Sequence, residues 1–435
     1  MSDPESTRRT PDLGFLAEAA ESREHADRRR RRLALIFPIV VTVTWFLAVL
    51  LTGNFGRVWD NIVAAPTMLV GSFVAGSTPQ GGGAVAFPVF TKGLGVPSEV
   101  ARTFSLAIQS IGMVAASVAI LVRRRAISVP AVLWSLPAAL IGLFVGLYFF
   151  SDRSTPFWTS LLPGPYVKVL FTLLVLAMAF VVYLGSRVPV REVRTSIDPL
   201  GRRQIVFLVV GALLGGLASS QVGSGADVLF FMVVVVMLGL EPGIGVPSSV
   251  LVMATVSVVG FTYLGLIQGQ IDVTVVNDMV TRVGDTVIAN PEAFPAARYD
   301  LLGLWLAAVP VVCWGAPLGS AFAARITSRQ LALFVAVLAA LEGGTTVLLL
   351  KELRTDPWLV VFAVVGGALL VGTLYLCVQF RHHIAEVRVN PSRSITREGI
   401  DVGPEFFADN RGSPRRSPPD ADQPADDPRQ NGEGT

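Results

Sequence analysis

The sequence predicts an all-α polytopic membrane protein made of two inverted repeats, with one extra helix at each end. Three observations predict this fold class. First, 52% of the residues are hydrophobic and only 15% are charged, with a mean hydropathy of +0.60, so most of the chain must face lipid. Second, two of its apolar regions are interrupted by glycine clusters. Third, the arginines gather in particular connections between apolar segments.

The composition also restricts the classes of binding partner that the chain can have. The formal net charge is +3, but the basic residues flank apolar segments and leave no basic stripe on a folded domain. This is the pattern of membrane anchoring, not of nucleic-acid binding. Cys313 and Cys377 lie far apart inside apolar segments, without metal-ligand spacing. We therefore expect a lipid bilayer around the protein, and no nucleic acid, metal or cofactor. The oligomeric state stays open.

The apolar segments give the order of the helices. A bilayer core of about 30 Å needs about 20 apolar residues in a helix. Two apolar regions, 67–95 and 204–240, are longer than this and are broken in the middle. We call residues 77–83, with the sequence STPQGGG, the first break, and residues 219–225, with the sequence SSQVGSG, the second break. The segments predicted as uninterrupted spans are 34–52, 100–122, 131–150, 167–186, 247–267, 301–320, 330–350 and 357–380.

The arginines indicate how the broken regions cross the membrane. A helix that is broken inside a bilayer must be shielded by protein or water, so each region either crosses once as a kinked helix or returns to its own side. With the arginine run 28–32 in the cytoplasm, returning regions place every basic connection inside, as the positive-inside rule requires. Single crossings would place two basic connections outside. The connections predicted inside are 123–125, 187–203, 325–329 and Arg381, and those predicted outside are 53–66, 151–166, 268–300 and 351–356.

Returning regions give the two halves opposite orientations in the cell membrane, with both termini in the cytoplasm. Each half is then a glycine-rich broken segment followed by three spanning helices, an architecture common among transporters.

Within the long connection 268–300 we expect a short surface helix over 271–282. The predicted parts are a basic tail (1–32), a first helix with an outer loop (33–66), a first repeat (67–203), a second repeat (204–356), a last helix (357–380) and a disordered tail (381–435).

The two halves match one another at four points in the same order. The sequence GGGA at 81–84 matches GSGA at 223–226, and the Leu-Gly pair at 94–95 matches the pair at 238–239. Further on, ARTFS at 101–105 matches GVPSS at 245–249, and IGLFVG at 141–146 matches WGAPLG at 314–319. With these motifs the chain resembles the TauE/SafE family of sulfite and organosulfonate exporters over roughly residues 65–350. The resemblance implies a membrane transporter for a small anion.

The two breaks are the predicted substrate site. Glycines let a ligand approach the backbone closely, and a half-helix that starts at a break directs its amides and dipole at an anion. Close packing of helices is the alternative role for small residues in membranes. The predicted substrate-binding residues are Ser77, Thr78, Gln80, Gly81, Gly82 and Gly83 from the first break, Ser219, Ser220, Gln221, Gly223, Ser224 and Gly225 from the second, and Arg102, Ser105 and Ser249 from the helices that follow.

Four ionisable side chains lie within apolar segments, where they are costly and therefore informative. Asp227, just after the second break, and Glu342, in the middle of a predicted span, are candidates for carrying a coupling proton, with a structural hydrogen bond as the alternative. Arg102 suits either pairing with Glu99 at the interface or contact with the substrate. Lys92 is interpreted as a side chain that extends to the membrane interface.

These features predict secondary transport of a small anion such as sulfite or a sulfonate, with protons as the candidate coupling ion. The alternative is a channel or a carrier for another small solute, such as a cation or a neutral metabolite. A cation pathway calls for several facing carboxylates, and the spans supply only Asp227 and Glu342. We do not expect an enzyme, because the spans contain no nucleophile–histidine, paired-aspartate or metal-ligand pattern. The direction of transport stays open.

Overall fold

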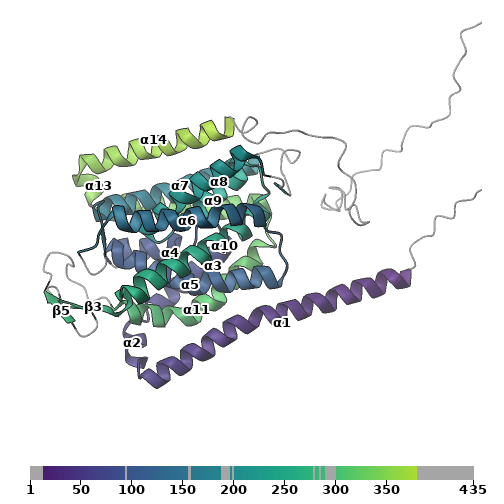
Figure 1. Cartoon of the computed structure of the whole chain (residues 1–435), viewed down its shortest axis with the longest axis horizontal. Helices are drawn as coiled ribbons and strands as arrows, with labels where there is room; N and C mark the ends of the chain where they lie inside the picture. Colours follow the sequence, from purple (N-terminus) through teal and green to yellow (C-terminus); the bar gives the residue numbers. More distant parts are fainter. Residues whose placement is uncertain are drawn as a thin grey trace, which may run out of the picture. The chain divides into compact units, whose positions relative to one another are not determined.

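A computed structural model describes residues 13–93, 96–154, 158–187, 196–197, 200–277, 280–283, 286–289 and 300–379. The chain divides into two units, Met1–Val387 and Arg388–Thr435, and the fold is described for the first unit alone. The predicted tail 381–435, most of the basic connection 187–203 and the pair at 94–95 lie outside the described residues. Figure 1 shows that the described part is almost entirely helical.

Within the described ranges, seven helices are long and apolar enough to cross a membrane, which confirms the multi-pass helical architecture. Two further helices, α7 (Gly164–Arg187) and α14 (Pro357–Gln379), contain shorter apolar segments at 164–180 and 357–373. The seven are α1 (Leu13–Thr52, with the candidate span at Arg28–Thr52), α5 (Ser98–Val122), α6 (Val129–Phe149), α8 (Arg202–Val222), α10 (Pro242–Phe261, continued by the π-helical turn η4, Thr262–Ile267), α11 (Leu301–Ala323) and α12 (Ser328–Leu349).

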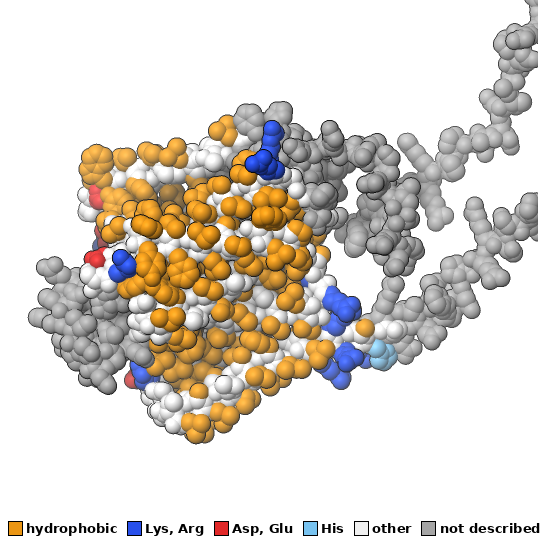
Figure 2. All heavy atoms as spheres, viewed as in Figure 1, with side chains coloured by type: hydrophobic (Ala, Val, Ile, Leu, Met, Phe, Trp, Pro, Cys, Tyr) orange, Lys and Arg blue, Asp and Glu red, His pale blue; other side chains and the backbone are white. Residues whose placement is uncertain are grey.

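The outer faces of these helices are apolar. Figure 2 shows hydrophobic side chains over the flank of the helices, with Lys and Arg side chains toward their ends. Large apolar residues such as Leu133 on α6, Leu348 on α12 and Leu369 on α14 are each more than 60% exposed. Water-soluble proteins rarely expose continuous apolar surfaces of this size, so these faces are suited to lipid.

Each break separates a longer helix from a short helix that packs back against it. In the first half, α3 (Ala64–Ser77) is followed by α4 (Gly83–Pro88) and the π-helical turn η1 (Val89–Gly93). In the second half, α8 is followed by α9 (Ala226–Phe231) and the π-helical turn η3 (Met232–Met237). The short helix of the second half runs antiparallel to α8, since Gly215 lies against Ala226 and Gly211 against Val233. The second region is therefore a pair of helices and not one kinked helix.

The matched residues Gly81 and Gly223 reverse the chain in the same way. Their φ angles are +67° and +74°, in the left-handed region that side chains other than glycine rarely adopt. The repeat found in the sequence is thus a repeat of backbone conformation at these two positions.

The helices of the two halves pair in a reciprocal manner. The first helix of each half packs against the third full helix of the other, α3 on α11 and α8 on α6, and α5 packs on α10 and α7 on α12. The matched glycines Gly142 and Gly315 lie in the first two interfaces. A Cβ on Gly142 would stand 2.0 Å from the carbonyl oxygen of Leu213, and one on Gly315 would stand 2.0 Å from Oγ of Ser72. These two glycines serve close helix packing.

The first helix is fastened to α11 from outside the repeats. Nε1 of Trp45 on α1 donates to the carbonyl oxygen of Leu306 (2.8 Å), and Nε1 of Trp314 donates to Oγ1 of Thr42 (3.0 Å). The buried apolar core of the first unit draws on helices of both halves and includes the fully buried Met113 of α5. Helix α1 is thus a fixed part of the first unit.

The connections hold the smaller elements. The expectation of a helix over 271–282 is wrong, because this segment forms strands; it is rich in β-branched Val and Thr, which suit strands. The smaller elements are α2 (Phe55–Asp60), the hairpin β1 (Ser151–Asp152) and β2 (Thr159–Ser160), the 3₁₀ turn η5 (Gln270–Asp272), the antiparallel sheet β3 (Val273–Asn277), β4 (Val280–Val283) and β5 (Thr286–Ala289), and α13 (Glu352–Thr355).

Candidate functional site

The two breaks touch each other. Oγ of Ser224 donates to the carbonyl oxygen of Gln80 at 3.4 Å, a contact between residues 144 positions apart in the sequence. A Cβ on Gly83 would stand 3.0 Å from Cβ of Ser224. Gln80, Gly83 and Ser224 are all buried. The two glycine-rich segments therefore form one buried site, with each half of the chain supplying one side.

Three side-chain oxygens converge on Gly81. A Cβ at this position would stand 2.8 Å from Oδ2 of Asp227, 2.9 Å from Oγ of Ser224 and 3.0 Å from Oε1 of Gln109. Within the described part of the chain, neither Oδ2 of Asp227 nor Oε1 of Gln109 has a hydrogen-bond partner, although both atoms are buried. A carboxylate oxygen and an amide oxygen are both acceptors. A proton on Asp227, a water molecule or a donor group of a ligand is needed to satisfy them.

Helix α5 holds the second break in place through a polar pair one helical turn apart. Nε2 of Gln109 donates to Oγ of Ser105 (2.7 Å) and to the carbonyl oxygen of Gly223 (2.8 Å). Oγ of Ser105 donates to the same carbonyl oxygen at 3.1 Å. Ser105 was among the residues predicted from the sequence. Gln109 was not, although its position four residues after Ser105 puts it on the same helix face.

Oxygens of the chain itself accept from the amides that begin α9, just after the second break. Oδ1 of Asp227 accepts from the N–H groups of Gly225 (3.3 Å) and Val228 (3.0 Å). Oγ of Ser219 accepts from the N–H group of Ala226 at 3.0 Å. The start of α9, where helical amides have no helical acceptor, is thus capped by Asp227 and Ser219. Little of its hydrogen-bonding capacity is left for an added anion.

The amides of the first break are open. The N–H groups of Val85 and Ala86 donate to the carbonyl oxygen of Gly82 (3.3 and 3.0 Å), whereas those of Gly82 and Gly83 meet no acceptor among the described residues. Nε2 and Oε1 of Gln80 are buried and likewise lack a partner in the described ranges. The first break therefore presents buried donors without acceptors, an arrangement that suits an anion.

The hydroxyl groups before the first break turn back onto their own helix. Oγ of Ser77 and Oγ1 of Thr78 both donate to the carbonyl oxygen of Val74 (3.2 and 3.0 Å). Rotation of either hydroxyl is needed before it can contact a ligand.

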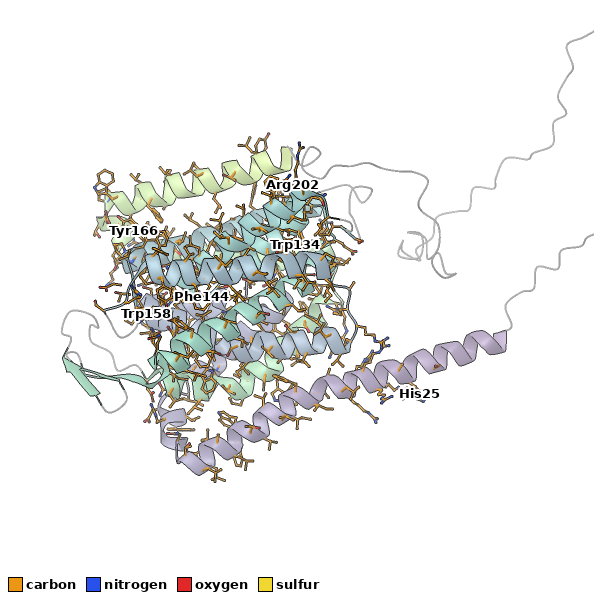
Figure 3. The ribbon with its side chains drawn as sticks, viewed as in Figure 1. His25, Trp134, Phe144, Trp158, Tyr166 and Arg202 are labelled. Carbon is orange, nitrogen blue, oxygen red and sulfur yellow. The ribbon has the colours of Figure 1, made fainter. Side chains whose placement is uncertain are left out.

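Arg102 joins the second break to a connection at one end of the helices. Its buried guanidinium donates from one Nη atom to the carbonyl oxygens of Trp158 (3.0 Å) and Ser220 (3.3 Å). Figure 3 shows Trp158 and Tyr166 at one end of the helices and Trp134 and Arg202 at the other. Arg102 is therefore a link between the site and the β1–β2 connection, held mainly by backbone oxygens.

Several predicted residues face away from the contact between the breaks. Nε2 of Gln221 donates to the carbonyl oxygen of Gly146 on α6 (3.3 Å), and its Oε1 accepts from Ser160 on β2 (2.6 Å). Oγ of Ser220 donates to Leu217 within its own helix, as Oγ of Ser249 does to Val246. These contacts favour structural roles for the three side chains.

Glu342 lies in a second polar cluster. It forms an ion pair with Lys92, and both side chains are buried (1% and 0% exposed). Oγ1 of Thr172 donates to Oε1 of Glu342 (2.8 Å), and Nζ of Lys92 donates to Oγ1 of Thr346 (2.7 Å). The interpretation of Lys92 as an interfacial side chain is wrong, because a buried carboxylate compensates its charge between η1, α7 and α12.

Comparison with known proteins gives one match. The family model described as sulfite exporter TauE/SafE matches residues 63–283, just over half of the chain. The matched range contains both breaks, Gln109 and Asp227, and ends before α11 and α12. No curated protein and no solved structure matches the chain.

Proposed function

The chain belongs to the TauE/SafE family of sulfite exporters, and on that premise we propose that it is a secondary transporter that moves a small oxyanion, such as sulfite or a sulfonate, past the contact between its two breaks. The observation that carries this proposal is the contact itself. Ser224 of the second break bonds to Gln80 of the first, and three oxygens surround Gly81. A buried polar site between two halves of a membrane protein is where transporters of repeated architecture bind their substrates.

The anion binds at the first break in this proposal. The N–H groups of Gly82 and Gly83 and the side-chain amide of Gln80 are buried donors without acceptors among the described residues. Sulfite and sulfonate oxygens are acceptors only, so the chemistry is complementary. At the second break, the N–H group of Gly225, which corresponds to that of Gly83, donates to Oδ1 of Asp227.

The proton binds at Asp227. Its Oδ2 lies 2.8 Å from the position that a Cβ on Gly81 would take, and a charged carboxylate this close to the first break would repel an anion bound there. Protonation of Asp227 removes this repulsion and lets Oδ2 donate to Oε1 of Gln109. Anion and proton therefore bind together and move in the same direction. Glu342 is left out of this step because Lys92 already compensates its charge.

The repeats have opposite orientations in this proposal, with both termini in the cytoplasm. The reciprocal pairing of α3 with α11 and of α8 with α6 supports it, as does the antiparallel course of α8 and α9. Labelling of single cysteines with an impermeant reagent tests it. Arg124→Cys, after α5, should react only from inside, and Gln268→Cys, after the matched helix α10 and η4, only from outside; reaction of both from one side would contradict the opposite orientations.

One observation favours a second candidate function, the binding of a small cation. The three atoms nearest to a Cβ on Gly81 are all oxygens: Oδ2 of Asp227, Oγ of Ser224 and Oε1 of Gln109. Oxygen ligands of this kind suit hard cations. A cation bound there would replace the proton, either as the coupling ion or as the transported solute.

Flux measurements in proteoliposomes test the proposal. Sulfite, a sulfonate, sulfate and a carboxylate are offered in turn, with and without a pH gradient and with and without sodium. We expect flux of sulfite or the sulfonate, accelerated when protons flow in the same direction. Gly344→Ala is the matched control, because a Cβ there meets nothing within 4 Å. If no anion moves while a cation or a neutral solute does, the proposal is wrong.

A further inference from the structure

A pocket lined by arginines lies where α1 passes the ends of α5 and α11. Its volume is about 260 Å³, and none of the described side chains that line it is acidic. Figure 2 shows Lys and Arg side chains gathered toward this end of the helices. The lining residues are Arg30 and Arg31 on α1, Arg123 and Arg125 after α5, and Ala321, Ala324 and Arg325 at the end of α11.

The backbone fixes the arginines that follow α5. The N–H group of Arg125 donates to the carbonyl oxygen of Ile120 (3.0 Å), and that of Arg124 donates to Leu121 (3.0 Å). Arg124 itself has a φ of +50°, so the helix ends in a left-handed cap. This cap turns the chain so that Arg123 and Arg125 both line the pocket.

Arg31 on α1 is held in place as well. Ala34, one turn after Arg31, is 2% exposed, and α1 packs along α5 and α11. The bond from Trp45 to Leu306 fixes the helix further along. The packing of α1 against α5 and α11 therefore places Arg31 at the pocket.

The charges in the pocket repel one another. Burial and the neighbouring charges of Arg31 and Arg325 lower the pKa of Arg123. Burial and the charge of Arg123 lower the pKa of Arg125 in the same way. Nε of Arg123 is buried without a hydrogen-bond partner in the described part of the chain. An anion in the pocket would relieve this repulsion.

We propose that this pocket binds a phosphate-bearing anion and thereby joins α1 to the ends of α5 and α11. A guanidinium donates two parallel hydrogen bonds to phosphate oxygens, which makes clustered arginines a recurrent phosphate site. The volume suits a phosphate or a small headgroup. Leu33 and Ile36 on α1 and Leu121 on α5 continue from the pocket as exposed apolar residues (42%, 51% and 52%). They would lie along the acyl chains of an anionic lipid whose phosphate occupies the pocket.

Binding to the purified full-length protein tests this proposal. Native mass spectrometry measures the retention of phosphatidylglycerol, with phosphatidylcholine as the neutral lipid, and inorganic pyrophosphate is added as the soluble competitor. The pocket variant is R123Q/R325Q. The matched control is R203Q/R329Q, which removes two exposed arginines outside the pocket. At about fivefold per arginine, phosphatidylglycerol should bind roughly 25-fold more weakly to the pocket variant and with unchanged affinity to the control.

A third variant separates charge from geometry. R123K/R325K keeps both charges, so it cannot misfold because a charge was removed. It does remove the paired donors of the guanidinium. We expect it to bind phosphatidylglycerol more weakly than the wild type and more strongly than R123Q/R325Q. Selective loss of pyrophosphate binding in the pocket variants would identify the anion as soluble phosphate and also support the pocket. Equal weakening in the pocket variant and the control, or no weakening in either, would overturn the proposal.

Discussion

The first and second breaks match in sequence but differ in the use of their amide groups. Both have a left-handed glycine at the matched position, Gly81 and Gly223. At the second break, Asp227 and Ser219 accept the hydrogen bonds of the amides that begin α9. At the first break, the amides of Gly82 and Gly83 have no acceptor among the described residues. The repeat thus preserves the left-handed glycine, whereas the hydrogen bonds of the amides differ, and Gly225 has a φ of +136° where the matched Gly83 begins α4.

The helices that follow the breaks, α5 and α10, differ in whether their polar side chains bond to the opposite break. Ser105 on α5 and Ser249 on α10 occupy matched positions, but Ser105 bonds across to Gly223 while Ser249 bonds within its own helix. Gln109, one turn after Ser105, also reaches Gly223. The first half therefore supplies side chains that hold the second break, and the second half makes no matching bond to the first break through Ser249.

The largest effect on transport is expected at the left-handed glycine of the first break. Gly81→Ala forces a side chain into a left-handed conformation and against Oδ2 of Asp227, 2.8 Å from the new Cβ. Displacement of this site by even 1 Å can cost about 100-fold in rate, so flux should fall by about that factor. Gly269→Ala is the control: its φ is also left-handed (+69°), but a Cβ there meets nothing within 4 Å. Equal flux in both variants would show that the first break is not the transport site.

Asp227→Asn should have the next largest effect. The amide oxygen still accepts from the N–H groups of Gly225 and Val228, so the cap of α9 remains, but the side chain no longer carries a proton. Anion flux driven by a pH gradient should fall by a factor between about 5 and 150, the usual range of coupling, while anion exchange without a gradient persists. Asp152→Asn, in the β1 connection, is the control. Unchanged acceleration by the gradient in Asp227→Asn would exclude Asp227 as the proton carrier.

Replacement of Gln109 tests the link that the first half makes to the second break. Gln109→Leu removes the donors to Ser105 and Gly223 and leaves their oxygens buried, which should lower the free energy of unfolding by about 2 kcal/mol and weaken anion binding. Ser110→Ala, which loses only a local bond to Ala107, should change neither. Thermal unfolding and anion-dependent stabilisation measure both quantities. A Gln109→Leu protein as stable as Ser110→Ala would contradict the assigned bonds.

The smallest effect on transport is expected from the Lys92–Glu342 pair. Glu342→Gln alone leaves a buried lysine charge and should cost about 3–5 kcal/mol of stability, and Lys92→Met/Glu342→Leu together should recover most of it. The dependence of flux on the pH gradient should be the same in the double variant as in the wild type. A lost dependence would restore Glu342 as a coupling residue.

The sequence predicts local features of this molecule better than contacts between distant segments. The breaks could be found because glycine and proline disturb a helix wherever they occur, and because GGGA and GSGA repeat. Gln109 carries no such signal: it is one polar residue in an apolar helix, and its role depends on a carbonyl group 114 positions away. The pairing of Lys92 with Glu342 spans 250 positions, so each charge taken alone suggested a different role.

The contact between the two breaks is tested most directly by a disulfide across it. In a chain with Cys313 and Cys377 replaced by alanine, Gly83→Cys/Ser224→Cys brings together two Cβ positions 3.0 Å apart, about 0.5 Å short of the range in disulfides, so a small outward shift of the two segments admits the bond. Oxidation should cross-link the halves and stop sulfonate flux, and a reducing agent should restore it; a sulfonate is used because sulfite itself cleaves disulfides. Gly93→Cys/Ser224→Cys should remain uncross-linked. A folded protein that fails to cross-link, or one that transports at the wild-type rate when cross-linked, would contradict the account.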